Sequence, residues 1–260
     1  MCEDNALVRK FKAGKATVQI YRSSQKMGEA AAEAVGKKAI ELISKKGRAS
    51  IVFASAPSQE EFLAALGKMD GIEWQRITAF HLDEYLGLPS DVPQAFGKFL
   101  KDRLFDRVKP GRVYYLDGTA ENLEEEAQRY TGLLEKNGLD IACVGIGENG
   151  HLAFNDPHVA DFDDPLTVKV VELDEVCLQQ QVNDGCFSSI DKVPKRALTL
   201  TMPAIFDAGY IFCIVPAKSK AEAVRKTVYG PISTSCPASI IRSHENAILF
   251  LDTDSAALLK

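Results

Sequence analysis

Long apolar runs, an excess of positive charge and paired cysteines are all missing from this 260-residue sequence. No segment approaches the roughly 20 apolar residues that a membrane-spanning helix needs. The first residues, which include Glu3 and Asp4, also lack the apolar stretch that a signal peptide requires. These absences predict a cytoplasmic protein with no membrane partner.

Net charge and cysteine spacing exclude a nonspecific nucleic-acid-binding protein and a scaffold held together by metal ions or disulfides. The chain has 31 basic and 36 acidic residues, a formal charge of -5, whereas nonspecific nucleic-acid binding needs a concentrated basic patch. Its six cysteines show neither paired metal-ligand spacing nor the density of a secreted disulfide scaffold. We therefore expect reduced thiols, no metal site and no nucleic-acid partner.

The sequence alternates short β-rich runs with helical segments, and several runs are nearly continuous in apolar residues, as strands covered on both faces are. Such alternation predicts parallel strands joined by right-handed crossovers. We predict one α/β domain over residues 1–260, a single doubly wound, mostly parallel, Rossmann-like sheet with helices on both faces. The expected strands are Thr17–Tyr21, Ser50–Ala54, Ile77–Leu82, Val113–Leu116, Ile141–Gly145, Val168–Val171, Ala197–Met202, Tyr210–Val215 and Ala247–Leu251.

Two segments carry apolar residues at helical spacing, Met27–Lys45 and Leu123–Lys136. The second stops at Asn137 and Gly138, which predicts a left-handed C-cap. In a sheet of this kind, ligands bind beyond the carboxyl ends of the strands. Chemistry is therefore expected where a strand runs into polar residues.

The first such junction follows the strand that ends near Ala54. Ser58 and Glu61 have the spacing of a capping box, which predicts a helix that begins just after Ser58. The free N–H groups and the dipole of that helix favour a phosphate, with the hydroxyls of Ser55 and Ser58 beside it. A plain N-cap without a ligand is the alternative.

A second junction places Asp83 and Glu84 directly after an apolar strand. Side chains alternate along an extended chain, so the two acids should point in different directions and have different roles. A carboxylate beside a sugar carbon can act as a general base. A solvated turn is the alternative.

Glycines dominate the third junction, where Gly145, Gly147 and Gly150 spell a dinucleotide-binding fingerprint. That fingerprint requires a following helix, and Pro157 arrives too early for one of normal length. We interpret the glycines instead as residues that let the backbone turn sharply and approach a ligand closely.

The same loop delivers His151 to the sheet edge, with Asn149 and Asp156 near it in sequence. Histidine titrates near physiological pH, so we favour catalysis over a structural role. Lys220 is a further candidate, because Ser219 and Glu222 form another capping-box pattern and would put it in a first helical turn near this edge. It could complete a phosphate site or be a solvated surface lysine.

The second and third junctions together resemble the glucosamine-6-phosphate deaminase family. Its members carry Asp-Glu-Tyr-x-Gly-Leu, present here from Asp83 to Leu88, and a Gly-x-Gly-x-(Asp or Asn)-Gly-His segment that runs on to a proline, present here from Gly145 to Pro157. The similarity extends through Asp191–Thr199 and Lys218–Lys226, so it covers most of the chain.

The resemblance implies an enzyme that converts glucosamine 6-phosphate and water into fructose 6-phosphate and ammonia without a cofactor or metal. Asp83 would move a proton between C1 and C2, and His151, oriented by Asn149 and Asp156, would open the sugar ring. The expected partner is a small sugar phosphate, and a homo-oligomer is a possible assembly. Substrate or phosphate binding is expected at Ser55, Ser58, Glu84, Gly147 and Lys220.

The chain departs from the family pattern in its phosphate loop, which usually reads close to Thr-Gly-Gly-Thr-Pro. Residues 55–59 keep two hydroxyls, lose both glycines and gain Pro57, which has no N–H to donate. A phosphate-binding arginine of the family aligns near Gly185 without a replacement. The arginine of an allosteric site is likewise not evident at residues 167–169, so we predict no such regulation.

Three functions stay open on this sequence. The first is an amino-sugar phosphate deaminase/isomerase, acting on glucosamine 6-phosphate or its galactosamine epimer. The second is a 6-phosphogluconolactonase-like hydrolase, although the loop's continuation over residues 154–157 favours the deaminase. The third is a noncatalytic sugar-phosphate sensor, which would need no base and hence no Asp83.

Overall fold

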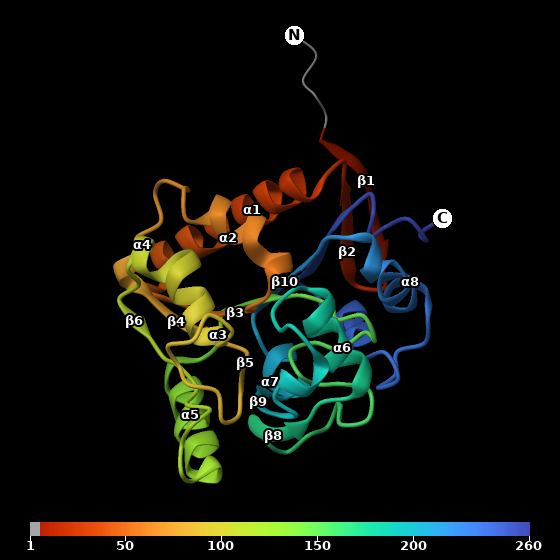
Figure 1. The fold of residues 1–260 in the computed structure, drawn as a ribbon. Helices are drawn as coiled ribbons and strands as arrows, with labels where there is room; N and C mark the ends of the chain where they lie inside the picture. The colour runs from red at the N-terminus through yellow and green to blue at the C-terminus, as the bar shows by residue number, and fades with distance from the viewer. Residues whose placement is uncertain (1–5) are drawn as a thin grey trace.

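The computed structural model describes residues 6–260. Its main sheet has eight strands in the order β1-β2-β11-β10-β7-β3-β4-β6 (Figure 1). All neighbours in it are parallel except the β1–β2 hairpin. The strands are β1 (Leu7–Ala13), β2 (Ala16–Tyr21), β3 (Ala49–Phe53), β4 (Ile77–His81), β6 (Arg112–Val113), β7 (Ile141–Val144), β10 (Tyr210–Val215) and β11 (Ala247–Asp252).

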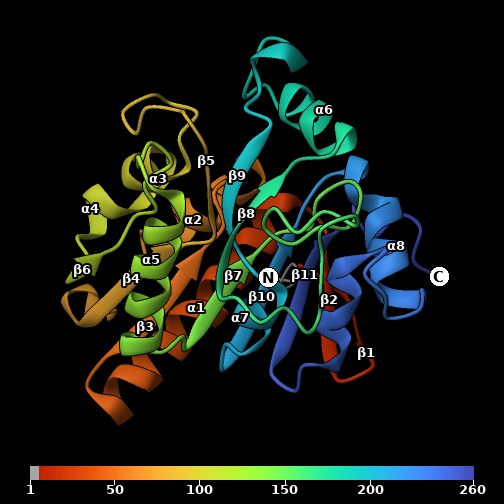
Figure 2. The same ribbon diagram turned by 90° about the horizontal axis from the view of Figure 1, so that it is seen from below.

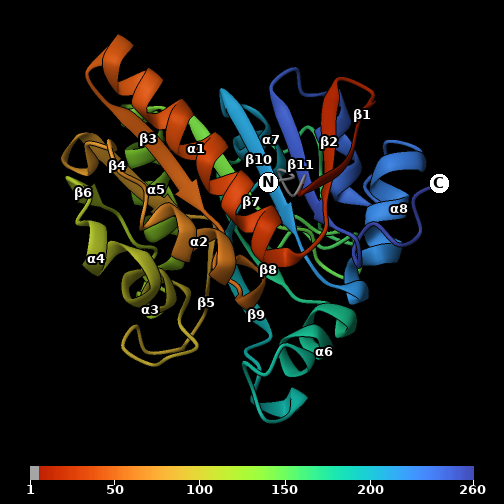
Figure 3. The ribbon, with the colours of Figure 1, turned by 90° about the horizontal axis from the view of Figure 1, so that it is seen from above.

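Helices cover both faces of this sheet. Figure 3 shows α1 and α2 across one face, and Figure 2 shows α5 and α7 on the other. Alternate residues of β7 explain why: Ile141 and Cys143 pack in the cluster with α1, while Ala142 and Val144 pack in the cluster with α5. The helices are α1 (Ser24–Lys46), α2 (Glu60–Leu66), α3 (Phe96–Leu100), α4 (Asp106–Val108), α5 (Leu123–Asn137), α6 (Glu175–Asn183), α7 (Met202–Phe206) and α8 (Ala221–Tyr229).

Both helices predicted from periodicity are present, with local caps that explain their ends. Helix α1 begins where the Ser23 hydroxyl accepts a hydrogen bond from the N–H of Lys26, and it ends at Gly47 in the left-handed region. Helix α5 ends at Gly138, which donates its N–H to the carbonyl of Leu134. Its φ of 71° is positive, but its ψ of 174° lies outside the left-handed helical region, so the predicted left-handed cap was wrong.

The prediction of one sheet was wrong in part, because three strands form a separate antiparallel sheet in the order β5-β9-β8. They are β5 (Asp83–Tyr85), β9 (Arg196–Leu200) and β8 (Val168–Glu172). Two of them had been expected in the parallel sheet. Their buried apolar side chains divide between two clusters. Val168, Leu198 and Leu200 pack in the cluster with α5, while Tyr85, Val171 and Ala197 pack in a small cluster with α6, which projects away from the main sheet in Figures 2 and 3.

Strand β1 was missed, since Arg9, Lys10 and Lys12 break its apolar pattern, as suits the edge of a sheet. The predicted strand at 113–116 is only Arg112–Val113.

The five cysteines within residues 6–260 are free thiols, as expected, while Cys2 and the N-terminal residues Glu3 and Asp4 lie outside the described part. Over residues 6–260, none of the helices combines the length and the apolarity needed to cross a membrane.

Candidate active site

A pocket lies where the carboxyl ends of β3, β4 and β7 meet, the edge at which parallel sheets bind ligands. Three junction loops supply most of its wall, and α3, α6 and the segment after β10 supply the rest. The residues that line it are Ala54, Ser55, Ala56, Pro57, Ser58, Gln59, Leu82, Asp83, Phe96, Gly145, Ile146, Gly147, His151, Ala153, Phe154, Gln180, Gln181 and Lys220.

The loop after β3 brings Ser55 and Ser58 to the pocket, but the predicted capping box is absent. Pro57 starts a short 3-10 turn, Pro57–Gln59, that leads into α2, and neither element has a side-chain cap. Ser58 lies inside this turn, where its hydroxyl accepts a hydrogen bond from Gln59 Nε2 at 3.2 Å. A proline at the first helical position fixes the start of the turn two residues earlier than the pattern indicated.

Gln59 is a pocket residue that the sequence did not reveal. Its Nε2 also donates to the carbonyl of Ile214 at 3.1 Å, so the amide ties the loop to β10. Its Oε1 is buried and has no hydrogen-bond partner within residues 6–260, and the same is true of the Ser55 hydroxyl. Buried polar atoms left in this state cost free energy, which a ligand that pairs with them would recover.

Asp83 follows β4 and lies in the pocket wall with only 6% of its surface exposed. Burial, and to a smaller degree the nearby Glu84, raises the pKa of its carboxyl well above the usual range. A carboxyl group with a raised pKa can both take and return a proton near neutral pH.

Glu84 points elsewhere, as strand alternation predicted, and it is not among the residues that line the pocket. Its carboxylate accepts backbone N–H hydrogen bonds from Phe96 at 3.0 Å and Gly97 at 2.9 Å, at the start of α3. Burial raises the pKa of Glu84, although these N–H donors oppose the shift. The expectation that Glu84 binds substrate is therefore replaced by a structural role that anchors α3 to β5.

Turns rather than a helix follow β7 in the glycine loop, so the dinucleotide fingerprint lacks the helix it needs. Gly147 has a different reason to be glycine, since a Cβ at this position would lie 2.1 Å from Cε1 of His151. The N–H of Gly147 also donates to the carbonyl of His151 at 3.0 Å. A side chain at residue 147 would therefore force the imidazole to move, so the position of the ring depends on this glycine.

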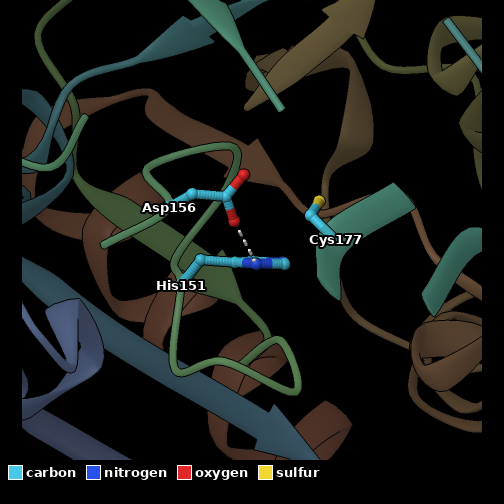
Figure 4. Close-up of side chains that lie close together, drawn as sticks. All are labelled: His151, Asp156 and Cys177. Atoms are coloured by element: carbon cyan, nitrogen blue, oxygen red, sulfur yellow. Dashed lines mark ion pairs between the residues drawn. The ribbon is translucent and has the colours of Figure 1, made fainter. Parts of the chain in front are cut away.

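His151, Asn149 and Asp156 come together as predicted (Figure 4 draws His151 and Asp156). His151 Nδ1 lies 2.9 Å from Asp156 Oδ1. Asn149 donates its Nδ2 to the same oxygen at 2.8 Å and accepts the backbone N–H of His151 at 3.0 Å. Burial would raise the pKa of Asp156, but the contacts from His151 and Asn149 outweigh it and the pKa is lowered. Asp156 therefore stays ionised and orients the imidazole, whose ring lines the pocket.

Asp174 extends this arrangement to α6. Its N–H donates to Asp156 Oδ2 at 3.1 Å, and its Oδ2 accepts from Asn149 Nδ2 at 2.8 Å. Its other oxygen caps α6 by accepting the N–H of Cys177 at 2.7 Å. The cap pattern of an aspartate before a helix was the available signal, but nothing local to residue 174 indicates its contact with residues 149 and 156.

Lys220 reaches the pocket from the turn Lys218–Lys220, before α8. The predicted capping box of Ser219 and Glu222 is absent, because Glu222 instead pairs with Arg225 at 2.7 Å. Lys220 is only 4% exposed, so the alternative of a solvated lysine was wrong. Its Nζ is buried without a hydrogen-bond partner in the described part of the chain, and burial lowers its pKa.

These groups define a class of protein: an α/β enzyme that holds a buried carboxyl, a carboxylate-oriented imidazole and a buried amine around one small polar pocket. Such a set supports acid–base chemistry on a small anionic molecule. Asp83 and His151 are far apart in the sequence, but the sheet brings them together. Asp83 follows β4 and His151 follows β7, and these two strands lie on either side of β3.

Comparison with known proteins gives the particular family. Residues 22–250 match the family model described as glucosamine-6-phosphate isomerases/6-phosphogluconolactonase, and the chain belongs to this family. It is 39% identical over 199 residues to glucosamine-6-phosphate deaminase 1 of Bacillus subtilis, covering 75% of this chain and 80% of that one. It is 33% identical over 227 residues to glucosamine-6-phosphate deaminase of Listeria innocua, covering 86% and 94%.

Solved structures agree with the sequence relatives. A monomeric glucosamine-6-phosphate deaminase superposes with a TM-score of 0.85 at 34% identity, over 93% of this chain and 99% of that chain. A 6-phosphogluconolactonase from Shewanella baltica gives a TM-score of 0.76 at 14% identity, over 93% and 100%. The second similarity shows a shared fold and nothing about activity.

Proposed function

We propose that this chain is an amino-sugar phosphate isomerase/deaminase, which converts glucosamine 6-phosphate, or its galactosamine epimer, and water into the ketohexose 6-phosphate and ammonia. The observation that carries the proposal is that Asp83 and His151 line the same pocket. The curated relatives named above, which are glucosamine-6-phosphate deaminases, support the substrate class.

Ring opening falls to His151 in this proposal. The hydroxyl at the anomeric carbon must lose a proton and the ring oxygen must gain one, and an imidazole can exchange a proton with both. Asp156 and Asn149 hold the ring in place, and Gly147 leaves the space in which it lies. The orientation is set before substrate arrives, which lowers the cost of reaching the reactive geometry.

Asp83 then transfers a proton between C2 and C1 of the open chain. As a carboxylate it removes the C2 proton of the amino aldose, and as a carboxylic acid it returns the proton to C1. One amine proton passes to O1 in the same conversion, which leaves an imine at C2 and a hydroxyl at C1. Water adds to that imine, and ammonia leaves. Burial raises the pKa of the Asp83 carboxyl, which makes its carboxylate form a stronger base for the first half of the transfer.

The phosphate would be held by buried groups that have no hydrogen-bond partner within residues 6–260. Lys220 Nζ and the Ser55 hydroxyl are two such donors in the pocket wall, and Ser58 lies in the turn that joins the loop after β3 to α2. A charge-assisted hydrogen bond from Lys220 would replace the missing family arginine with a single cation. Phosphate binding at a distance from the reacting carbons keeps those carbons in register with Asp83.

Ammonia release from glucosamine 6-phosphate, galactosamine 6-phosphate and unphosphorylated glucosamine tests the proposal directly. We expect turnover of at least one phosphate, little with the free sugar, and a loss of at least about 100-fold in kcat for Asp83→Asn. The exposed Asp91 offers a matched control, since Asp91→Asn should keep the wild-type rate. Hydrolysis of 6-phosphogluconolactone without ammonia release would favour the hydrolase, and binding without turnover of any compound would favour the sensor.

Assembly is a separate part of the proposal. A homo-oligomer is a possible assembly for this chain, whereas one of its structural relatives is described as monomeric. Light scattering at enzymatic concentrations would give the assembly state.

A further inference from the structure

A thiol lies beside the imidazole and the carboxylate of the pocket. Cys177, in the first turn of α6, is fully buried, and one ligand atom each from His151, Asp156 and Cys177 lie within 4.8 Å of one another. Figure 4 shows His151 and Asp156 on the loop after β7, with Cys177 on α6 beside them. Two separate segments meet here, which is why cysteine spacing in the sequence gave no sign of such a group.

The three side chains are the donor set that zinc prefers. Zinc binds imidazole nitrogen and carboxylate oxygen at about 2.0–2.2 Å and thiolate sulfur at about 2.3 Å, usually with tetrahedral geometry. Ligand atoms around such an ion are roughly 3.5 Å apart. A separation of at most 4.8 Å therefore needs only a small side-chain movement to close around an ion.

A neighbouring group is less suited to the same ion. Asp156 also lies near His158 and Asp174, whose ligand atoms meet the same distance limit. That group has no sulfur ligand, and His158 is exposed. The thiol-containing group, by contrast, adjoins the pocket through His151, which gives an ion a path of entry.

We propose that His151, Asp156 and Cys177 form an inhibitory site for a thiophilic divalent cation such as Zn²⁺. The imidazole lone pair, one carboxylate oxygen and the thiolate each make one bond to the ion. The thiol proton is released to solvent, and the imidazole proton stays on the nitrogen that does not bind. Inhibition, which rests on the proposed function, follows because a metal-bound His151 can no longer exchange protons with the sugar.

Metal binding by itself is measured without any substrate. Equilibrium dialysis of the full chain with Zn²⁺ should show one tightly bound ion, and Co²⁺ in its place should give a near-ultraviolet thiolate-to-metal absorption band. In Cys177→Ser the band should vanish and Zn²⁺ affinity should fall at least about tenfold, since even the loss of an outer-shell partner costs about 10–100-fold. Cys186→Ser, which changes the other cysteine near α6, is the matched control and should keep both.

Ammonia release then tests the inhibition, with each variant compared with its own metal-free rate. Zn²⁺ should inhibit the wild type, EDTA should restore the rate, and Mg²⁺, which prefers oxygen ligands in octahedral geometry, should have no effect. Equal sensitivity of Cys177→Ser and wild type to Zn²⁺, or no thiolate band with Co²⁺, would overturn the inference. Failure of the proposed function would show instead as a chain that binds Zn²⁺ through Cys177 and releases no ammonia even after EDTA treatment.

Discussion

Replacement of Lys220 by methionine should weaken the enzyme and stabilise the empty protein. Methionine matches the length and flexibility of the lysine stem without its amine. The amine is buried, 4% exposed, and without a partner in residues 6–260, so it costs about 1–3 kcal/mol in the absence of ligand. Lys220→Met removes that cost, and the melting temperature of the ligand-free protein should rise.

The pH dependence of this gain has a definite sign. Burial lowers the pKa of Lys220 in the folded state below its unfolded value of about 10.4. Because the unfolded chain then binds the proton more tightly, the wild type gains stability as pH rises from the folded pKa toward the unfolded one. The advantage of Lys220→Met should be largest at neutral and lower pH and should shrink toward pH about 10.

Activity should change in the opposite direction. Loss of a charge-assisted hydrogen bond to phosphate costs about 1.5–3 kcal/mol, which corresponds to a fall of roughly 10- to 100-fold in kcat/KM. Inorganic phosphate should raise the melting temperature of the wild type but not of Lys220→Met. Lys218→Met, an exposed lysine in the same turn, should change none of these values. A Lys220→Met protein with normal kcat/KM, or one less stable than wild type, would refute the reasoning.

Three further predictions test other parts of the site. Because burial raises the pKa of Asp83, its neutral form stabilises the fold at low pH, and this contribution is lost as pH rises through the folded pKa. The melting temperature of Asp83→Asn should therefore exceed that of the wild type at pH 8, with a smaller difference at pH 5. Gly147→Ala should displace the imidazole and lower kcat at least about tenfold while the fold survives by circular dichroism; a normal kcat would contradict the contact. Asp174→Ala should lower the free energy of unfolding by about 1 kcal/mol, because the cap of α6 is lost, and should also lower kcat. Asp174→Asn should recover most of the stability. Loss of stability without a change in kcat would limit Asp174 to capping.

The sequence predicted the parallel core well, because local periodicity decides both helix formation and which strand faces are apolar. Helix α1 and the strands β3, β4 and β7 are examples, and each carries its own signal. The small antiparallel sheet was not predictable in the same way. Its strands β8 and β9 have apolar patterns like those of the main sheet, and their separate antiparallel pairing with β5 depends on contacts between segments far apart in the sequence.

In the candidate site, too, residues with a local sequence signal could be predicted, and contacts between distant segments could not. Asp83 and His151 could be predicted because each follows an apolar strand, and the carboxyl ends of parallel strands meet at one edge. The burial of Lys220, the pocket position of Gln59 and the link through Asp174 depend on contacts between distant segments. Both capping-box patterns near the pocket proved wrong, since a 3-10 turn occupies each position instead.

A crystal structure with an acyclic amino-alditol phosphate, which resembles the open-chain sugar, would test most directly whether one sugar meets both groups. We predict that its phosphate lies beside Lys220 and that its C1–C2 end lies within hydrogen-bond reach of Asp83, about 2.6–3.2 Å. Its C5 hydroxyl, which becomes the ring oxygen of the closed sugar, should lie beside His151. A compound that binds in the pocket with its C1–C2 end away from Asp83, or that contacts only one of the two residues, would contradict it.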